Sequence, residues 1–119
     1  MLPHIVNQIK NNREIRINDL APRRDYLYVK DLVNAIILAL DVNIEFEVFN
    51  IGSGESYSVG EIILMLQKIN RSNLPVYSGS NIRKGEIVDT VADISKAKEI
   101  LKWSPSWNIY AGLKELIEH

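Results

Sequence analysis

The chain has 119 residues, of which 46% are hydrophobic and 24% charged, so it fits one globular domain with a core of its own. Fourteen basic and fifteen acidic residues give a net charge of -1, which offers no electrostatic case for binding nucleic acid or an anionic membrane. The absence of cysteine excludes disulfides, thiolate catalysis and cysteine-based zinc sites. No apolar run reaches the roughly 18 residues of a membrane span and the first residues lack a signal-peptide pattern, so we expect a cytoplasmic protein.

Helices are predicted wherever apolar residues recur at helical spacing or a capping motif precedes such a run. The clearest start is the Ser-x-x-Glu capping box of Ser58 and Glu61. In chain order, the predicted helices span residues 2–10, 30–40, 58–70, 95–103 and 109–119.

Extended segments alternate with these helices. Alternating, β-branched and aromatic residues predict strands at 14–17, 24–29 and 45–51. Shorter extended stretches are expected at 76–77 and over 86–94. The order of strands and helices favours an α/β fold of mixed short strands and about five helices, with some parallel strand pairing.

The predicted helix at 30–40 is apolar in nearly every direction around its axis, with Asn34 as the one polar interruption in its apolar run. A surface helix of a small domain should carry a polar face, whereas a helix that is apolar all round needs cover on most sides. Two interpretations remain open: the helix is the centre of a compact domain, or its cover belongs to a larger protein.

Two neighbouring arginines, Arg23 and Arg24, stand before the strand and helix of "RDYLYVKDLVNA". A guanidinium group presents a planar fork of donors that matches carboxylate or phosphate oxygens. The sequence therefore allows an anion site here. It equally allows an ordinary ion pair of Arg24 with Asp25, Asp31 or a carboxylate in a turn.

Other candidate motifs are weaker when taken alone. The "RKGE" stretch places Arg83 and Lys84 just before a glycine and Glu86, which suits either a phosphate and sugar contact or a charged turn. The "GSGESY" loop has Tyr57 where a dinucleotide loop needs glycine and has no Walker lysine, so a tight strand-to-helix turn is favoured. The two histidines are isolated near the termini and give no metal site or catalytic triad.

Together and in this order, the stretches "RRDYLYVKDLVNAIILAL", "EVFNIGSGESYSVGEI" and "RKGEIVDTVADISKAKEILKWSPSWNIYAGLKELI" resemble the C-terminal part of the extended short-chain dehydrogenase/reductase family. These are the NAD-dependent nucleotide-sugar epimerases and dehydratases. The resemblance covers the whole chain, from "LPHIVNQI" onwards, which looks like the family's helix after the catalytic half.

The resemblance implies roles for six positions. Arg24 takes the place of the arginine that binds the substrate diphosphate, with Arg23 as a candidate helper, and Arg83 takes the place of a second phosphate contact. Glu86 corresponds to an acid that contacts the ribose. The strand ending at Ile17 resembles the segment on which the base rests, and Thr90 lies where some relatives contact the sugar.

The resemblance also implies what the chain lacks. The family's NAD-binding Gly-x-x-Gly-x-x-Gly loop does not occur in it. The family's catalytic Tyr-x-x-x-Lys pair lies on one helix, whereas Tyr26 and Lys30, which have this spacing, lie across the predicted junction of a strand and a helix. We therefore expect residues 1–119 to be the substrate-binding region of a 4-epimerase or 4,6-dehydratase, with NAD bound by a missing N-terminal Rossmann domain and no catalysis by this chain alone. The expected partners are a nucleotide-diphosphate sugar and that domain, with self-association through exposed apolar faces. The alternative is a self-standing, non-catalytic binding or interaction module derived from the family.

Overall fold

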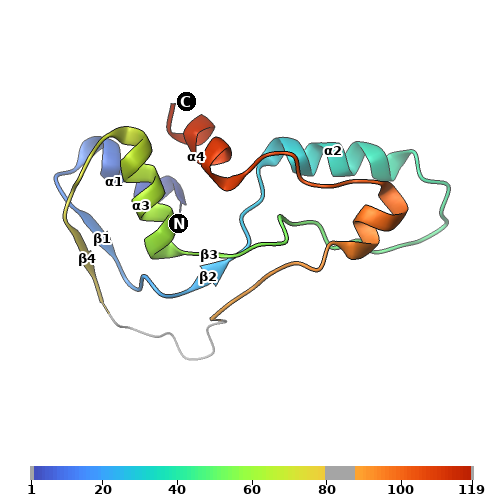
Figure 1. Cartoon of the computed structure of the whole chain (residues 1–119), viewed down its shortest axis with the longest axis horizontal. Coiled ribbons are helices and arrows are strands. Elements are labelled where there is room, and N and C mark those ends of the chain that lie inside the picture. The colour runs from blue at the N-terminus through green and yellow to red at the C-terminus, as the bar shows by residue number, and fades with distance from the viewer. Residues whose placement is uncertain (1, 80–87, 119) are drawn as a thin grey trace.

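The structure, a computed structural model, describes residues 2–79 and 88–118. It has an elongated shape, with extents of 52 × 35 × 16 Å (Figure 1). The elements are α1 (Leu2–Asn11), β1 (Ile15–Ile17), β2 (Arg23–Arg24), α2 (Val29–Leu40), β3 (Tyr57–Ser58), α3 (Val59–Asn70), β4 (Val76–Ser78), the π-helix η1 (Ala97–Leu101) and α4 (Ile109–Glu118). In the described ranges the expected α/β arrangement of five helical elements and short strands is confirmed.

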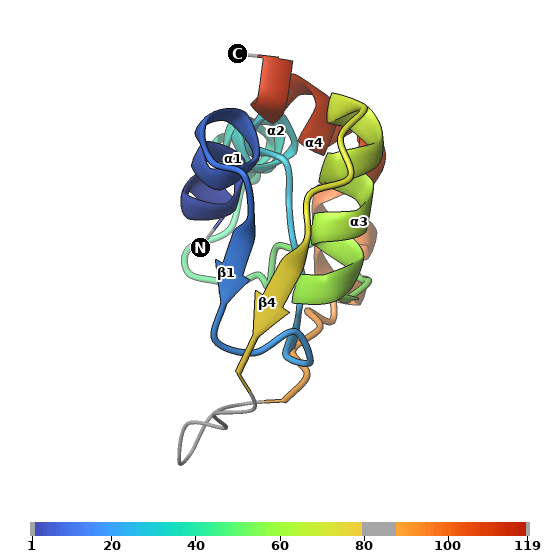
Figure 2. The same ribbon diagram turned by 90° about the vertical axis from the view of Figure 1, so that its left-hand side faces the viewer.

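The first hydrophobic core lies where α1, α3 and α4 meet the small parallel sheet of β1 and β4. The sheet is in register from Ile15 opposite Val76 to Ile17 opposite Ser78, and Figure 2 shows the two strands side by side. Helical spacing brings the apolar residues of each helix to one face, where they become buried. The buried members are Ile5, Ile9, Ile15, Val59, Ile62, Ile63, Leu66, Leu113 and Ile117.

Two buried glutamines form hydrogen bonds with backbone groups in this sheet and just before it. The amide of Gln8 on α1 accepts from the backbone N–H of Arg16 at 2.6 Å and donates to the Arg16 carbonyl at 3.2 Å. Gln67 on α3 makes the same pair of bonds with Leu74, just before β4, at 2.7 and 3.0 Å. Each side-chain amide satisfies both backbone groups of one residue, which a buried backbone requires.

The second core is smaller and lies between α2 and the helical turn around η1. Its buried members are Ala35, Ile94, Ala97, Leu101 and Trp103. Only Asp31 and Ala35 of α2 are buried. Seven large apolar residues of this helix are exposed, from 36% for Leu38 to 81% for Leu40: Val29, Leu32, Val33, Ile36, Ile37, Leu38 and Leu40. The sequence-based expectation that α2 needs additional cover therefore agrees with its exposure in the described structure.

Two predicted strands differ from the structure. The strand predicted at 24–29 is reduced to β2, because β3 pairs only with Arg23 and Arg24 and α2 already begins at Val29. The strand predicted at 45–51 is wrong: this segment has no regular structure and pairs with no described strand. Phe46 is 84% exposed there, so the alternating pattern has no surface to pack on.

The helix predictions agree with the structure to within a few residues. The capping box of α3 is confirmed: Ser58 accepts from the Glu61 N–H, and the Glu61 carboxylate accepts from the Ser58 N–H. The helix predicted at 95–103 is shorter, because the chain turns left-handed at Lys102 (φ 56°) after η1. Of the extended stretch predicted at 86–94, only residues 88–94 are described.

Candidate functional site

The site region is the short antiparallel pair of β2 and β3, in which Arg23 lies opposite Ser58 and Arg24 opposite Tyr57. Successive side chains of a strand point to opposite faces. The two arginines therefore face opposite sides of β2, although the sequence places them next to each other. This geometry gives them different roles.

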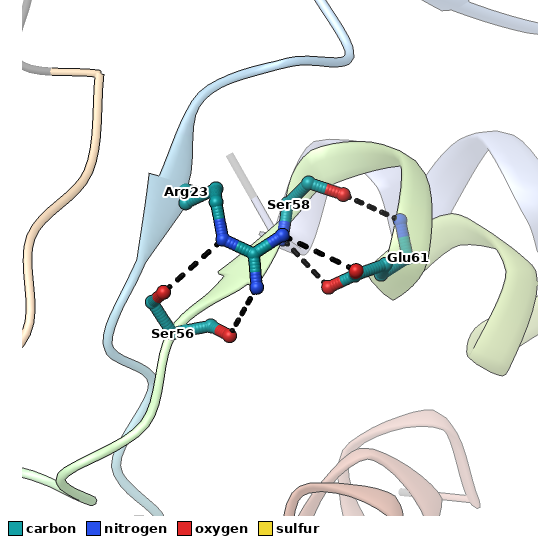
Figure 3. Close-up of polar contacts among 4 residues, drawn as sticks. All are labelled: Arg23, Ser56, Ser58 and Glu61. Carbon is teal, nitrogen blue, oxygen red and sulfur yellow. Dashed lines mark hydrogen bonds and ion pairs between the residues drawn. The ribbon is translucent and has the colours of Figure 1, made fainter.

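Arg23 points toward the start of α3 and is fixed there (Figure 3). Its Nη2 donates to the Ser56 carbonyl at 2.8 Å and its Nε to the Ser56 hydroxyl at 3.2 Å. Its Nη1 forms an ion pair with Glu61 at 3.2 Å. The hydrogen bond from the Ser58 backbone, together with that from Arg23, lowers the pKa of Glu61. The guanidinium group of Arg23 thus ties β2 to the loop before β3 and to α3.

Arg24 lies on the other face and is half-buried. Its Nη1 donates to the Arg23 carbonyl at 2.7 Å. Burial raises the pKa of the Tyr26 hydroxyl, and the positive charge of Arg24 offsets part of that shift. An ion pair at this strand end is described for Arg23, with Glu61. For Arg24, the alternative of an ion pair stays a prediction.

Asp25 joins three remote segments. Its carboxylate accepts from the Ser53 hydroxyl at 2.6 Å, the Ser53 N–H at 2.7 Å, the Gly54 N–H at 3.0 Å and the Ala92 N–H at 3.1 Å. Partial burial raises the pKa of Asp25, but these hydrogen bonds outweigh it and the net pKa is lowered. A Cβ at Gly52 would lie 2.7 Å from this carboxylate and 2.6 Å from Ala92, so the close approach requires glycine.

Asp31 likewise joins α2 to the segment before α4 through hydrogen bonds. This buried carboxylate accepts from the Ser106 hydroxyl at 2.8 Å, and from the N–H groups of Ser106 and Trp107 at 3.0 Å. The Trp103 indole donates to the Asp31 carbonyl at 3.0 Å. The two acids of "RDYLYVKD" therefore hold backbone in place.

Several backbone N–H groups of the glycine-rich loop, and of the helix start after it, are hydrogen-bonded within the protein. The N–H groups of Ser53 and Gly54 are bonded to Asp25. At the start of α3, the Val59 and Gly60 N–H groups donate to the carbonyls of Pro22 and Leu20, and Glu61 is bonded by the capping box. These internal hydrogen bonds agree with the interpretation of the loop as a tight strand-to-helix turn.

Three of the predicted site residues are described. The backbone of Arg23 forms an isolated parallel β-bridge with Asp89, and the Arg23 N–H donates to the Val88 carbonyl at 2.8 Å. This pairing brings the next residues of the two segments, Arg24 and Thr90, near one another. Thr90 is exposed. Ile17 instead ends β1, where its carbonyl accepts from Gly79, and it packs on the first core. Arg83 and Glu86 lie outside the described residues.

Two features near the site were not predicted from the sequence. The Tyr26 hydroxyl is buried and has no hydrogen-bond partner among the described residues. A mostly apolar hollow of about 490 Å³ lies between the starts of α2 and α4, with Tyr28, Val29, Trp107 and Leu116 in its lining. The aromatic residues around "RDYLYV" were the available signal, but an aromatic strand predicts burial without saying against what.

The described residues include neither a candidate metal-binding group nor a candidate membrane-spanning helix. Among residues 2–79 and 88–118, no group of three or more His, Asp or Glu side chains is placed to bind a metal. No described helix has the length and apolarity needed to cross a bilayer.

Comparison with known proteins decides the family. Residues 1–116 match the family model described as GDP-mannose 4,6 dehydratase. The chain belongs to this family. The resemblance to NAD-dependent nucleotide-sugar epimerases and dehydratases of the extended short-chain dehydrogenase/reductase group is thereby confirmed.

Individual family members match nearly the whole chain. The dTDP-4-dehydro-6-deoxyglucose reductase of Escherichia coli is 30% identical over 99% of this chain and 37% of its own length. The UDP-glucose 4-epimerase of Thermotoga maritima, solved with UDP-glucose, has 32% identity and a TM-score of 0.81 over 98% of this chain and 37% of that one. The UDP-glucuronic acid 4-epimerase of Bacillus cereus, solved with UDP-glucuronic acid and NAD, has 30% identity and a TM-score of 0.86, covering 98% and 39%. The chain thus spans less than two-fifths of the length of these relatives.

Proposed function

We propose that this chain is the substrate-binding region of an NAD-dependent nucleotide-sugar 4-epimerase or 4,6-dehydratase. Its role is to hold the diphosphate of the nucleotide sugar so that the sugar faces the reacting centre, a contribution of orientation to catalysis. The chain by itself is proposed not to catalyse the reaction. Family membership supports the class of substrate, and the solved complexes of relatives with UDP-sugars agree with it.

The observation that carries this proposal is the position of Arg24. It is half-buried and leaves β2 on the face opposite the Arg23–Glu61 pair. Its guanidinium is oriented by the Arg23 carbonyl. A guanidinium has five N–H donors in a planar fork and stays charged, which suits it to binding phosphate oxygens.

In the proposal, a second contact with the diphosphate comes from the segment before Val88. Arg83 is proposed to contact the diphosphate from its other side and Glu86 to contact the ribose. The described structure supports this to the extent that the chain after these residues is hydrogen-bonded to β2 at Arg23. Thr90 is proposed to contact the sugar, and the end of β1 at Ile17 to support the base.

The partner in the proposal is the N-terminal Rossmann domain of the parent enzyme, which would bind NAD and cover α2. Seven exposed apolar side chains on this helix, and the adjoining hollow at Tyr28 and Val29, form an apolar surface of the kind that marks an interaction site. This exposure favours the present proposal over a self-standing module, which should have a polar surface. The same surface is proposed to cause self-association of the chain when no partner covers it. The cytoplasmic location stays a prediction.

Titration calorimetry of the chain with UDP, TDP and GDP tests the proposal. The Arg24→Met variant keeps an apolar stem but loses the charged donors, so its affinity for the preferred nucleotide should fall about 10- to 100-fold. Arg13→Met, at an exposed position before β1, removes the same charge elsewhere and should bind like the parent. No binding by the parent chain, or equal binding by Arg24→Met, would contradict the proposal.

A further inference from the structure

We infer that Arg23 is a positioning residue for Arg24: it fixes the backbone carbonyl that orients the Arg24 guanidinium. This inference rests on the proposed role of Arg24 in binding a diphosphate. It assigns Arg23 a task other than touching the ligand.

The first step is the anchoring of Arg23. Three bonds from one guanidinium group reach the Ser56 hydroxyl, the Ser56 carbonyl and the Glu61 carboxylate, at 2.8–3.2 Å (Figure 3). Glu61 is itself held by the capping box with Ser58. The Arg23 side chain is therefore tied to a helix start that has its own local support.

The second step is the transfer of this anchoring to the backbone. The Arg23 N–H donates to the Val88 carbonyl at 2.8 Å, and the Arg23 carbonyl accepts from Nη1 of Arg24 at 2.7 Å. β2 has only two residues, so it has few ladder bonds with which to fix its own orientation. The side-chain bonds of Arg23 supply a fixation that so short a strand lacks.

The third step concerns what an oriented guanidinium contributes. A long, flexible side chain loses rotamer freedom when it binds, and an arginine already held in place loses less on binding. Arg23 faces away from Arg24 across β2, because neighbouring strand residues point to opposite faces. Its influence on the ligand therefore passes through Arg24.

The test compares the affinities of variants for whichever of UDP, TDP and GDP the parent chain binds best. Arg23→Met should weaken binding about threefold to tenfold, the range expected when one side chain must be ordered during binding. In the Arg24→Met background, Arg23→Met should have no further effect on affinity. Arg13→Met serves as the charge control and should match the parent. All affinities are measured where circular dichroism shows each variant folded.

Glu61→Gln separates positioning from direct contact. If Arg23 positions Arg24, weakening its ion pair should lower affinity by about twofold. If Arg23 were itself a phosphate ligand, releasing it from Glu61 and removing a negative charge should raise affinity, which would overturn the inference. Should Arg23→Met fail to fold, Arg23→Lys keeps the charge for Glu61 but not the fork for Ser56, and an intermediate affinity is expected.

Three further outcomes are decisive and distinct. If Arg23→Met lowers the melting temperature but the folded protein binds as tightly as the parent, Arg23 is merely structural and the inference is wrong while the proposed function stands. If an effect of Arg23→Met persists in the Arg24→Met background, the influence does not pass through Arg24. If the parent chain binds none of the three nucleotides, the proposed function itself fails and the inference with it.

Discussion

The end of the molecule formed by α1, α3, α4 and the β1–β4 sheet buries nine apolar side chains in one cluster, whereas the end formed by α2 and η1 buries five. The second cluster is smaller although α2 is the more uniformly apolar helix. At the first end, three helices and a sheet surround one another. At the second end, α2 packs mainly on η1 and leaves most of its apolar surface exposed.

The two ends show that an apolar sequence predicts that a helix will be buried, but not which element will cover it. Amphipathic α1 and α3 have one apolar side each, which this chain can cover by itself. α2 is apolar nearly all round, and the described part of the chain covers one side of it. The uncovered side is the part of the molecule on which the proposed partner domain would dock.

Truncation of one isoleucine in each region gives the largest expected contrast. Ile62 on α3 is fully buried, so Ile62→Ala should lower the free energy of unfolding by about 2–5 kcal/mol through lost burial and a cavity. Ile36 on α2 is 53% exposed, and Ile36→Ala should lower it by less than about 1 kcal/mol. Urea unfolding measures both. Equal losses would show that α2 is as well packed in the chain as α3 is.

A substitution at Asp25 tests how much the hydrogen bonds that connect the two ends of the molecule contribute to its stability. Asp25 joins β2 to the loop at Ser53 and Gly54 and to Ala92 beside the second core, and Asp25→Asn should lower the free energy of unfolding by about 1–2 kcal/mol at pH 7. The folded-state pKa of Asp25 is lowered below the ordinary value of 3.8. Its stabilisation is therefore fully present above pH 3.8 and is lost as the pH falls through the folded-state pKa.

Unfolding of the parent and the Asp25→Asn variant at a series of pH values measures this dependence. The difference between the two proteins should be constant near neutral pH and shrink in acid. A difference that grows in acid would have the wrong sign for a carboxylate of lowered pKa.

The smallest effect on stability is expected from making the exposed side of α2 polar. Val33→Ser with Ile36→Ser should change the free energy of unfolding by less than about 1 kcal/mol, yet weaken self-association about fivefold by removing apolar contact area. Sedimentation velocity over a range of concentrations measures this. Leu64→Ser, at a 71% exposed position of α3, is the matched control and should leave association unchanged. Association that is insensitive to the α2 substitutions would place the contact elsewhere.

Local signals account for what the sequence predicted well. The capping box of Ser58 and Glu61 acts over three residues, and helical periodicity acts over a turn, so the start of α3 and the extent of α2 were predictable. The strand predicted at 45–51 was wrong because a strand needs a neighbour, and alternation of Phe46 and Val48 does not supply one. The proposed site divides in the same way: the sequence named the arginine pair, but their separate directions follow from pairing with β3.

Patterns within the sequence were enough to predict the helices, the α/β class and, through the order of its motifs, the family. The ion pair of Arg23 with Glu61, and the position of Arg24 on the other side of β2, became visible in the folded chain alone. The tertiary structure also showed that the acids of "RDYLYVKD" hold backbone, as in the bond of Asp31 to Ser106, 75 residues away along the chain. The physical reason is range: propensity and capping act between near neighbours, whereas the partner of a charged side chain is chosen by the fold.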